Sequence, residues 1–121
     1  MLKGVLIAES LRVRASLDDL NLVVRRIRRL QPRGATADQA PTWTLLDFEV
    51  DEPDAEALAQ RLAAALAAPG WYADFHSPAE SYVVFPDRVF RFRRGDAAGR
   101  AEAEAHARTL GIPEQQLDWP A

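Results

Sequence analysis

The chain has 121 residues, of which 48% are hydrophobic and 27% charged, with a formal net charge of −3 and no cysteine. This length fits one domain, residues 1–121, that buries enough surface to fold without disulfides or a structural metal. The absence of cysteine excludes disulfides, thiol nucleophiles and thiolate metal sites, and the negative charge argues against general nucleic-acid binding.

The N-terminal apolar run is too short for a signal peptide or a membrane span. We therefore expect a soluble, cytoplasmic protein that does not enter a membrane. Fourteen arginines stand against one lysine, a bias that suggests a GC-rich bacterial coding sequence more than a function.

Residues 3–11 are apolar and partly β-branched, and we expect them to form the first strand. Residues 20–30 allow two interpretations. As a helix they place one apolar stripe opposite four arginines. As a strand they use their β-branched residues well, and Asn21 is a poor residue for a helix interior. The pattern alone slightly favours the helix.

The remaining elements follow more clearly. Pro32, Gly34 and Pro41 indicate a loop over 31–42, and residues 43–50 alternate as a strand. Residues 51–70 form the clearest helix, with acidic residues and Pro53 in its first turn. Three short strands joined by tight turns occupy 71–96. A second Ala-rich helix follows Asp96, and we expect the closing residues 112–119 to pack Leu117 and Trp119 against the body.

From Trp43 onward, the segments WTLLDFEVD, GWYADFHS, YVVFPDRVFRFRRGD and GIPEQQLDW resemble a family of small uncharacterised bacterial proteins, a domain of unknown function. The resemblance covers most of the chain and implies no activity, cofactor or catalytic residue. It implies a strand at the segment equivalent to 20–30. We therefore expect this segment to form a strand paired as a hairpin with 3–11.

The expected fold is α+β. It is a two-layer sandwich of a largely antiparallel sheet of about six strands, with two Ala-rich helices on one face, in the order β-β-β-α-β-β-β-α. The predicted core consists of Phe48, Leu58, Leu62, Leu66, Phe75, Val84, Phe85, Phe90 and Phe92. The other sheet face would then expose apolar residues, which predicts self-association as a homodimer. Loop 31–42 is the alternative cover for that face.

The densest polar group is predicted around Asp74, His76 and Glu80. Asp74 and His76 share a strand face at i,i+2, where a carboxylate can orient an imidazole as a general base or supply part of a metal site. A solvent-facing pair beside a turn is the favoured interpretation. With only two histidines and no H-x-x-x-H frame or Gly-rich loop, we expect neither a metal nor a cofactor.

Arginines near the second helix complete the speculative binding residues, which are Asp74, His76, Arg88, Arg91, Arg93 and Arg94. An anion could bind at the helix N-terminus, but Asp96 competes there as the cap. Phe90 and Phe92 interleave with arginines as in sheets that stack single-stranded RNA. The two phenylalanines lie on the face opposite Arg91 and Arg93, however, so we do not expect nucleic-acid binding.

Three functions are therefore ranked. The first is a non-catalytic binding or protein-interaction module that uses one sheet face. The second is a small-molecule-binding protein or enzyme that uses the Asp74 and His76 neighbourhood. The third is a nucleic-acid accessory protein that uses the Arg-rich strands. The lack of a nucleophile motif or metal frame favours the first over the second, and the net negative charge favours it over the third.

Overall fold

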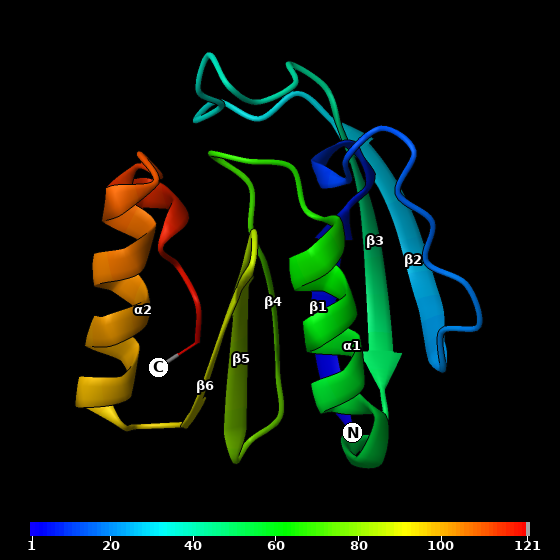
Figure 1. The fold of residues 1–121 in the computed structure, drawn as a ribbon, viewed down its shortest axis with the longest axis vertical. Coiled ribbons are helices and arrows are strands. Elements are labelled where there is room, and N and C mark those ends of the chain that lie inside the picture. Colours follow the sequence, from blue (N-terminus) through cyan, green and yellow to red (C-terminus); the bar gives the residue numbers. More distant parts are fainter. Residues whose placement is uncertain (121) are drawn as a thin grey trace.

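The computed structural model describes residues 1–120. It contains one six-stranded sheet with the strand order β2-β3-β1-β4-β5-β6 and two α-helices (Figure 1). Every neighbouring pair of strands is antiparallel. The predicted α+β class, antiparallel sheet and two helices are thus confirmed. The elements are β1 (Leu2–Ile7), β2 (Leu22–Leu30), β3 (Trp43–Val50), α1 (Glu52–Ala65), β4 (Ala73–His76), β5 (Glu80–Phe85), β6 (Arg88–Arg93) and α2 (Ala97–Thr109).

The ambiguous segment is a strand, as expected, but it does not form a hairpin with β1. β2 pairs with β3, from Leu22 opposite Val50 to Leu30 opposite Trp43. The chain between β1 and β2 does not turn back on β1 as a hairpin. It runs along α1 instead, where the Arg12 amide donates to the Ala65 carbonyl at 2.8 Å. The predicted pairing of 20–30 with 3–11 is therefore wrong.

β1 instead lies inside the sheet, between β3 and β4. Gly4 allows this position, because a Cβ there would stand 2.4 Å from the Cβ of Phe75 and 2.5 Å from the Asp74 carbonyl oxygen. Only a residue without a side chain lets the two backbones approach so closely.

α1 covers one face of the sheet. Its first turn contains Pro53 and two acids, which suit a helix N-terminus. Its Leu58 and Leu62 are buried against Phe48 and Phe75 from the strands. The helix ends at Ala65, earlier than Pro69 and Gly70 had indicated, because Leu66 is already extended and forms a bridge with Leu11.

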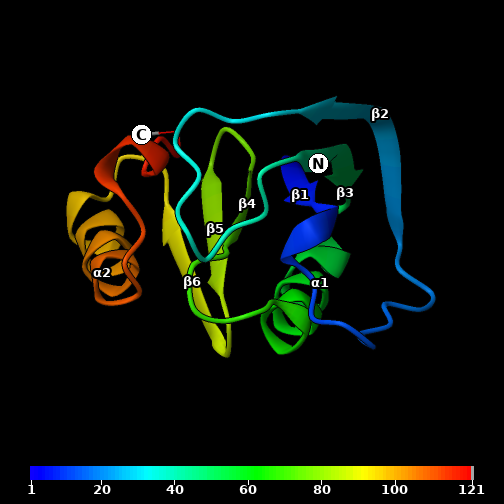
Figure 2. The same ribbon diagram turned by 90° about the horizontal axis from the view of Figure 1, so that it is seen from above.

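α2 lies on the opposite face, which corrects the prediction that both helices share one face. Tyr82 and Val84 of β5 belong to the core beneath α1, whereas Val83 and Phe85 belong to the core beneath α2. Adjacent residues of a strand point to opposite faces, so β5 is buried on both sides. Figure 2 shows the two helices on opposite sides of the strands.

All nine predicted core residues are buried, with exposed fractions from 0% to 9%. They divide between the two cores, because Phe85, Phe90 and Phe92 pack under α2 and the other six pack under α1. Leu117 and Trp119 are buried as expected.

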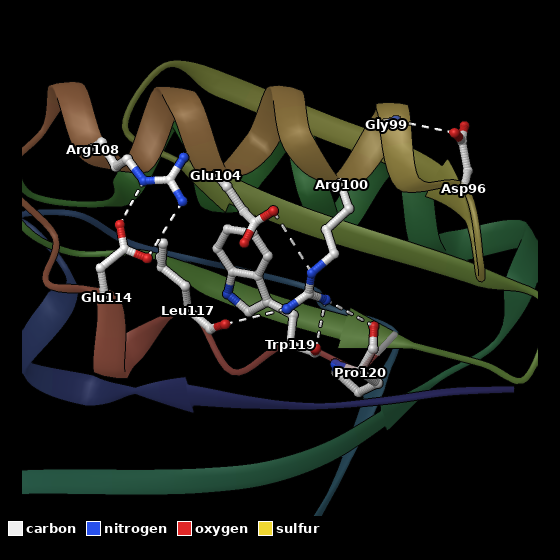
Figure 3. A network of polar contacts seen from close by, with 9 residues as sticks. All are labelled: Asp96, Gly99, Arg100, Glu104, Arg108, Glu114, Leu117, Trp119 and Pro120. Atoms are coloured by element: carbon white, nitrogen blue, oxygen red, sulfur yellow. Dashed lines mark hydrogen bonds and ion pairs between the residues drawn. The ribbon is translucent and has the colours of Figure 1, made fainter.

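The C-terminal segment is fastened to α2 by Arg100 (Figure 3). The guanidinium donates to the carbonyls of Trp119 at 2.6 Å, Leu117 at 3.2 Å and Pro120 at 3.3 Å. Because one side chain satisfies three backbone acceptors, the segment is held in place without regular secondary structure. Arg108 forms a second attachment through its ion pair with Glu114.

Loop 31–42 reaches the C-terminal segment at the end of the sheet, seen at the top of Figure 1. Buried Gln39 donates to the carbonyl of Gly70 at 2.8 Å and exchanges hydrogen bonds with Gln116. Gln116 also donates to the Gly34 carbonyl at 2.7 Å. The loop and the C-terminal segment thus close one end of the fold. None of the helices in residues 1–120 is long and apolar enough to cross a bilayer.

Candidate functional site

The sheet face opposite α1 carries a row of charged side chains where no helix covers it, here called the open face. The register places Lys3 of β1 directly opposite both Glu49 of β3 and His76 of β4. Arg25 of β2 extends the row, with its Nε 2.9 Å from a Glu49 carboxylate oxygen, and the Lys3 Nζ lies 3.8 Å from Glu49. Three strands therefore contribute alternating charges to this row, and β4 adds the imidazole of His76.

A second row crosses the open face beside the first. Arg28 of β2 donates two hydrogen bonds of 3.0 Å to the carboxylate of Asp47 on β3. Arg26 reaches the same carboxylate only at 3.9 Å. Val5 stands opposite Asp47 and opposite Asp74 of β4. Asp47 thus forms ion pairs with both arginines but accepts hydrogen bonds only from Arg28.

The two rows enclose a shallow groove of about 470 Å³, lined by residues of β1, β2 and β3 and by His76. A second hollow of about 350 Å³ lies at the β4–β5 turn and shares Lys3 and His76 with the groove. Lys3 and His76 therefore stand where the two hollows meet. Both hollows therefore lie beside His76, one of the predicted site residues.

Asp74 and His76 lie on the same face, as predicted. Burial and then the nearby Asp118 carboxylate raise the pKa of Asp74 to about 7. Burial, followed by the charges of Arg94 and Lys3, lowers the pKa of His76, so its imidazole is neutral at pH 7. Within residues 1–120 no hydrogen bond or ion pair joins Asp74 to His76, and the buried Nδ1 of His76 has no hydrogen-bond partner. The carboxyl therefore does not orient the imidazole in this structure.

The structure brings only one of the four predicted arginines to this site. Arg94 donates to the Ser77 carbonyl at 2.8 Å, beside His76. Arg88 lies over the ring of Phe90 at 4.7 Å, at the other end of β6. Arg91 and Arg93 lie on the α1 side of the sheet.

The α1 side of β6 shows why those two arginines cannot reach His76. Arg91 lies over the Tyr82 ring at 5.3 Å and pairs with Glu80 at 3.5 Å, and Arg93 stands opposite Glu80 in the register. On β6, Arg91 and Arg93 alternate with Phe90 and Phe92, which pack under α2. The two arginines therefore point to the other face of the sheet, away from His76. The expectation that Arg88 or Arg91 joins Asp74 and His76 is therefore wrong, and Arg93 and Glu80 likewise face away from His76.

Sequence reasoning missed the other residues of the open face. Asp47 and Glu49 are two residues apart on one strand, and four arginines lie within residues 25–29. The opposite charges of these two segments could have indicated that they pair. Lys3 gave no sign of its role, because its position depends on β1 lying between β3 and β4. Within residues 1–120, no group of three or more potential ligands could hold a metal ion.

β2 forms one edge of the sheet, and no strand within residues 1–120 pairs with its outer side. Among the described residues, the large apolar side chains exposed on strands are Val23, Val24 and Ile27, all on β2, with Val24 44% and Ile27 66% exposed. A bulge between Val24 and Arg26 shifts the register. Consequently Val24 and Ile27, opposite Phe48 and Leu46, both lie on the α1 side.

No family model, curated protein or solved structure shows a significant match to this sequence. The resemblance to a family of small uncharacterised bacterial proteins therefore remains an expectation.

Proposed function

We propose that this protein is a non-catalytic protein-interaction module in which β2 receives an extended segment of a partner as an added strand. The single observation behind the proposal is that the exposed large apolar side chains of the sheet gather on its unpaired edge strand. An exposed edge offers a row of backbone donors and acceptors to an extended chain. Proteins protect an unused edge by shortening or covering it or by placing charges and bulges on it. β2 carries arginines and a bulge, but it is nine residues long and exposes three large apolar side chains.

The opposite edge of the sheet supports this choice by contrast. β6 has six residues against nine in β2, and its Phe90 and Phe92 are buried under α2. It exposes no large apolar side chain. Of the two edges, only β2 combines length, free backbone groups and apolar contact surface.

A small-molecule ligand in the groove beside His76 is the second candidate function. The groove's volume of about 470 Å³ favours it, since ligand pockets commonly enclose 300–1,000 Å³. An enzymatic role for Asp74 and His76 has less support, because no hydrogen bond joins the two side chains within residues 1–120. We therefore rank binding above catalysis.

A homodimer stays a prediction. Over β5 and β6, α2 already covers the sheet face opposite α1, so that part of the face needs no second copy to bury it. Cytoplasmic location also stays a prediction. For the β2 edge itself a second copy is a poor partner, because pairing two β2 strands would bring their arginines together, and like charges opposite each other destabilise a strand pair.

The test uses an acetylated and amidated peptide with the sequence of residues 43–51, the strand that already pairs with the inner side of β2. Fluorescence anisotropy measures its binding to the whole protein. We expect binding that Ile27→Lys abolishes and Val13→Lys leaves unchanged, because Val13 is 93% exposed and lies outside the sheet.

Two further peptides, methylated on alternate backbone nitrogens in opposite phase, identify the binding mode. We expect affinity to fall only for the peptide whose methyl groups replace the amide hydrogens that would point toward β2. Equal affinity of both methylated peptides, or equal effects of the two lysine variants, would overturn strand addition at β2. Sedimentation at micromolar concentration tests the homodimer separately.

A further inference from the structure

We infer that the segment received by β2 alternates acidic and apolar residues, with the acids on the open face and the apolar residues on the α1 side. This inference rests on the proposed function, and it names the chemistry of the partner. Three features of β2 carry it: an excess of cations, a divided arrangement of apolar and charged residues, and the strand that already occupies its inner side.

The first feature is that the carboxylates of β3 do not satisfy the arginines of β2. Asp47 receives both of its hydrogen bonds from Arg28. Arg26, whose side chain is 64% exposed, therefore remains 3.9 Å away, beyond hydrogen-bond distance. Within residues 1–120, Arg26 therefore has no hydrogen-bonded carboxylate on the open face.

The same excess appears at one other position on the open face. Glu49 is shared between Arg25 and Lys3, and the Arg25 side chain is 61% exposed. Arg29 is exposed and has no ion pair within residues 1–120, but it stands opposite Thr44 and therefore lies on the α1 side. The outer strand thus carries more positive charge than its neighbour neutralises, in a protein whose net charge is −3.

The second feature is the division of β2 into two faces. The division holds from Val24 to Arg28, where Val24 and Ile27 lie on the α1 side and Arg26 and Arg28 on the open face. Outside this stretch, Val23 lies on the open face opposite Glu49, and Arg29 lies on the α1 side opposite Thr44. Side chains of an added strand would meet these faces alternately. An apolar residue beside Ile27 would be flanked by residues that face Arg26 and Arg28, where a carboxylate is the complementary group.

The third feature is β3 itself, which shows that β2 accepts this pattern. Asp47 and Glu49 face the arginines of β2, while Phe48 and Val50 point to the α1 side. A segment with the same alternation on the outer side of β2 would repeat the contacts of the inner side.

The experiment compares two peptides on the whole protein. The acidic peptide has the sequence of residues 43–51, and the neutral peptide carries Asp47→Asn, Glu49→Gln and Asp51→Asn. At low salt we expect the acidic peptide to bind roughly three- to tenfold more tightly, as for a few exposed ion pairs. The preference should vanish in high salt, where the charges are screened.

Protein variants then locate the preference. Arg26→Gln should remove most of it, whereas Arg29→Gln should leave it nearly unchanged, because Arg29 lies on the α1 side of β2. Arg93→Gln serves as the matched control, because Arg93 is an exposed arginine on the other edge of the sheet and should leave the preference unchanged. Circular dichroism checks that all variants fold.

The outcomes separate the two proposals. Equal affinity for both peptides, with binding still lost in Ile27→Lys, would contradict the acidic partner and leave strand addition intact. Failure of both peptides to bind would contradict the proposed function itself. An acidic preference that survives Arg26→Gln but is lost in Arg93→Gln would move the binding surface to β6 and overturn both.

Discussion

Arg28 and Asp47 form an ion pair across β2 and β3 with two hydrogen bonds, Nε to Oδ2 and Nη2 to Oδ1, both 3.0 Å long. Arg26 shares the carboxylate without such a bond. Because paired hydrogen bonds fix the geometry of an ion pair, Arg28→Gln should lower the free energy of unfolding by up to about 1 kcal/mol. Arg26→Gln should change it by less than about 0.3 kcal/mol. Urea denaturation measures both, and equal losses would show that the two arginines share Asp47 evenly.

The close approach of β1 and β4 predicts a strong effect at Gly4. A methyl group there would stand 2.5 Å from the Asp74 carbonyl oxygen, so the backbones must separate. Gly4→Ala should therefore cost about 1–3 kcal/mol or more. The control is Gly34→Ala, whose Cβ would lie 3.4 Å from the flexible Gln115 side chain and should change stability by less than about 1 kcal/mol. Similar losses in both variants would contradict the packing described for β1.

Asp74 predicts a dependence of stability on pH. Burial, and then Asp118, raises its pKa from 3.8 to about 7 in the folded protein. The folded state therefore holds a proton that the unfolded state has lost between these values. Stability contributed by the protonated carboxyl is complete below about pH 4 and falls as the pH rises towards about 7.

Asp74→Asn removes this dependence, because the amide stays neutral. The variant should be more stable than the parent at pH 8 and nearly equal at pH 4, as measured by denaturation at both values. Asp118→Asn should shift the transition only partly, since Asp118 is the second cause of the raised pKa. A stability difference between Asp74→Asn and the parent that does not vary with pH would contradict the assignment.

Nucleic-acid affinity should be absent or weak. Phe90 and Phe92 are 9% and 6% exposed, so they cannot stack on bases as in single-strand binding sheets. Arg25 and Arg28 are engaged by Glu49 and Asp47. Titration with mixed single-stranded RNA and duplex DNA at low salt is the most sensitive test. Tight binding that weakens steeply with salt would raise the nucleic-acid hypothesis above the others.

The strand at 20–30 shows why its sequence pattern misled. Residues three apart share a face in a helix, and Val24 and Ile27 are three apart. In the structure they share a face because the bulge between Val24 and Arg26 shifts the phase of the strand by one residue. A bulge thus produces the spacing of a helix, and residue spacing alone cannot distinguish the two.

The placement of α2 could have been predicted from the sequence. Residues 82–85 are apolar without alternation, which is typical of a strand buried on both faces. The ion pairs of the open face could not be predicted from the sequence, because the contacts of Lys3 with Glu49 and of Arg28 with Asp47 depend on strand order and register. Such order is decided by tertiary packing, in particular by the close fit of Gly4 against Phe75.

Protection of the β2 amides against hydrogen exchange, measured by NMR on the free protein and with the acidic 43–51 peptide, tests the central claim most directly. In the free protein we expect alternate amides of β2, those that point away from β3, to exchange fast, because they lack a backbone partner. The peptide should protect these amides between Arg26 and Leu30 and leave β6 unchanged. Protection confined to β6 or to residues around His76, with the outer amides of β2 still exchanging fast, would contradict the assignment of β2 as the binding edge.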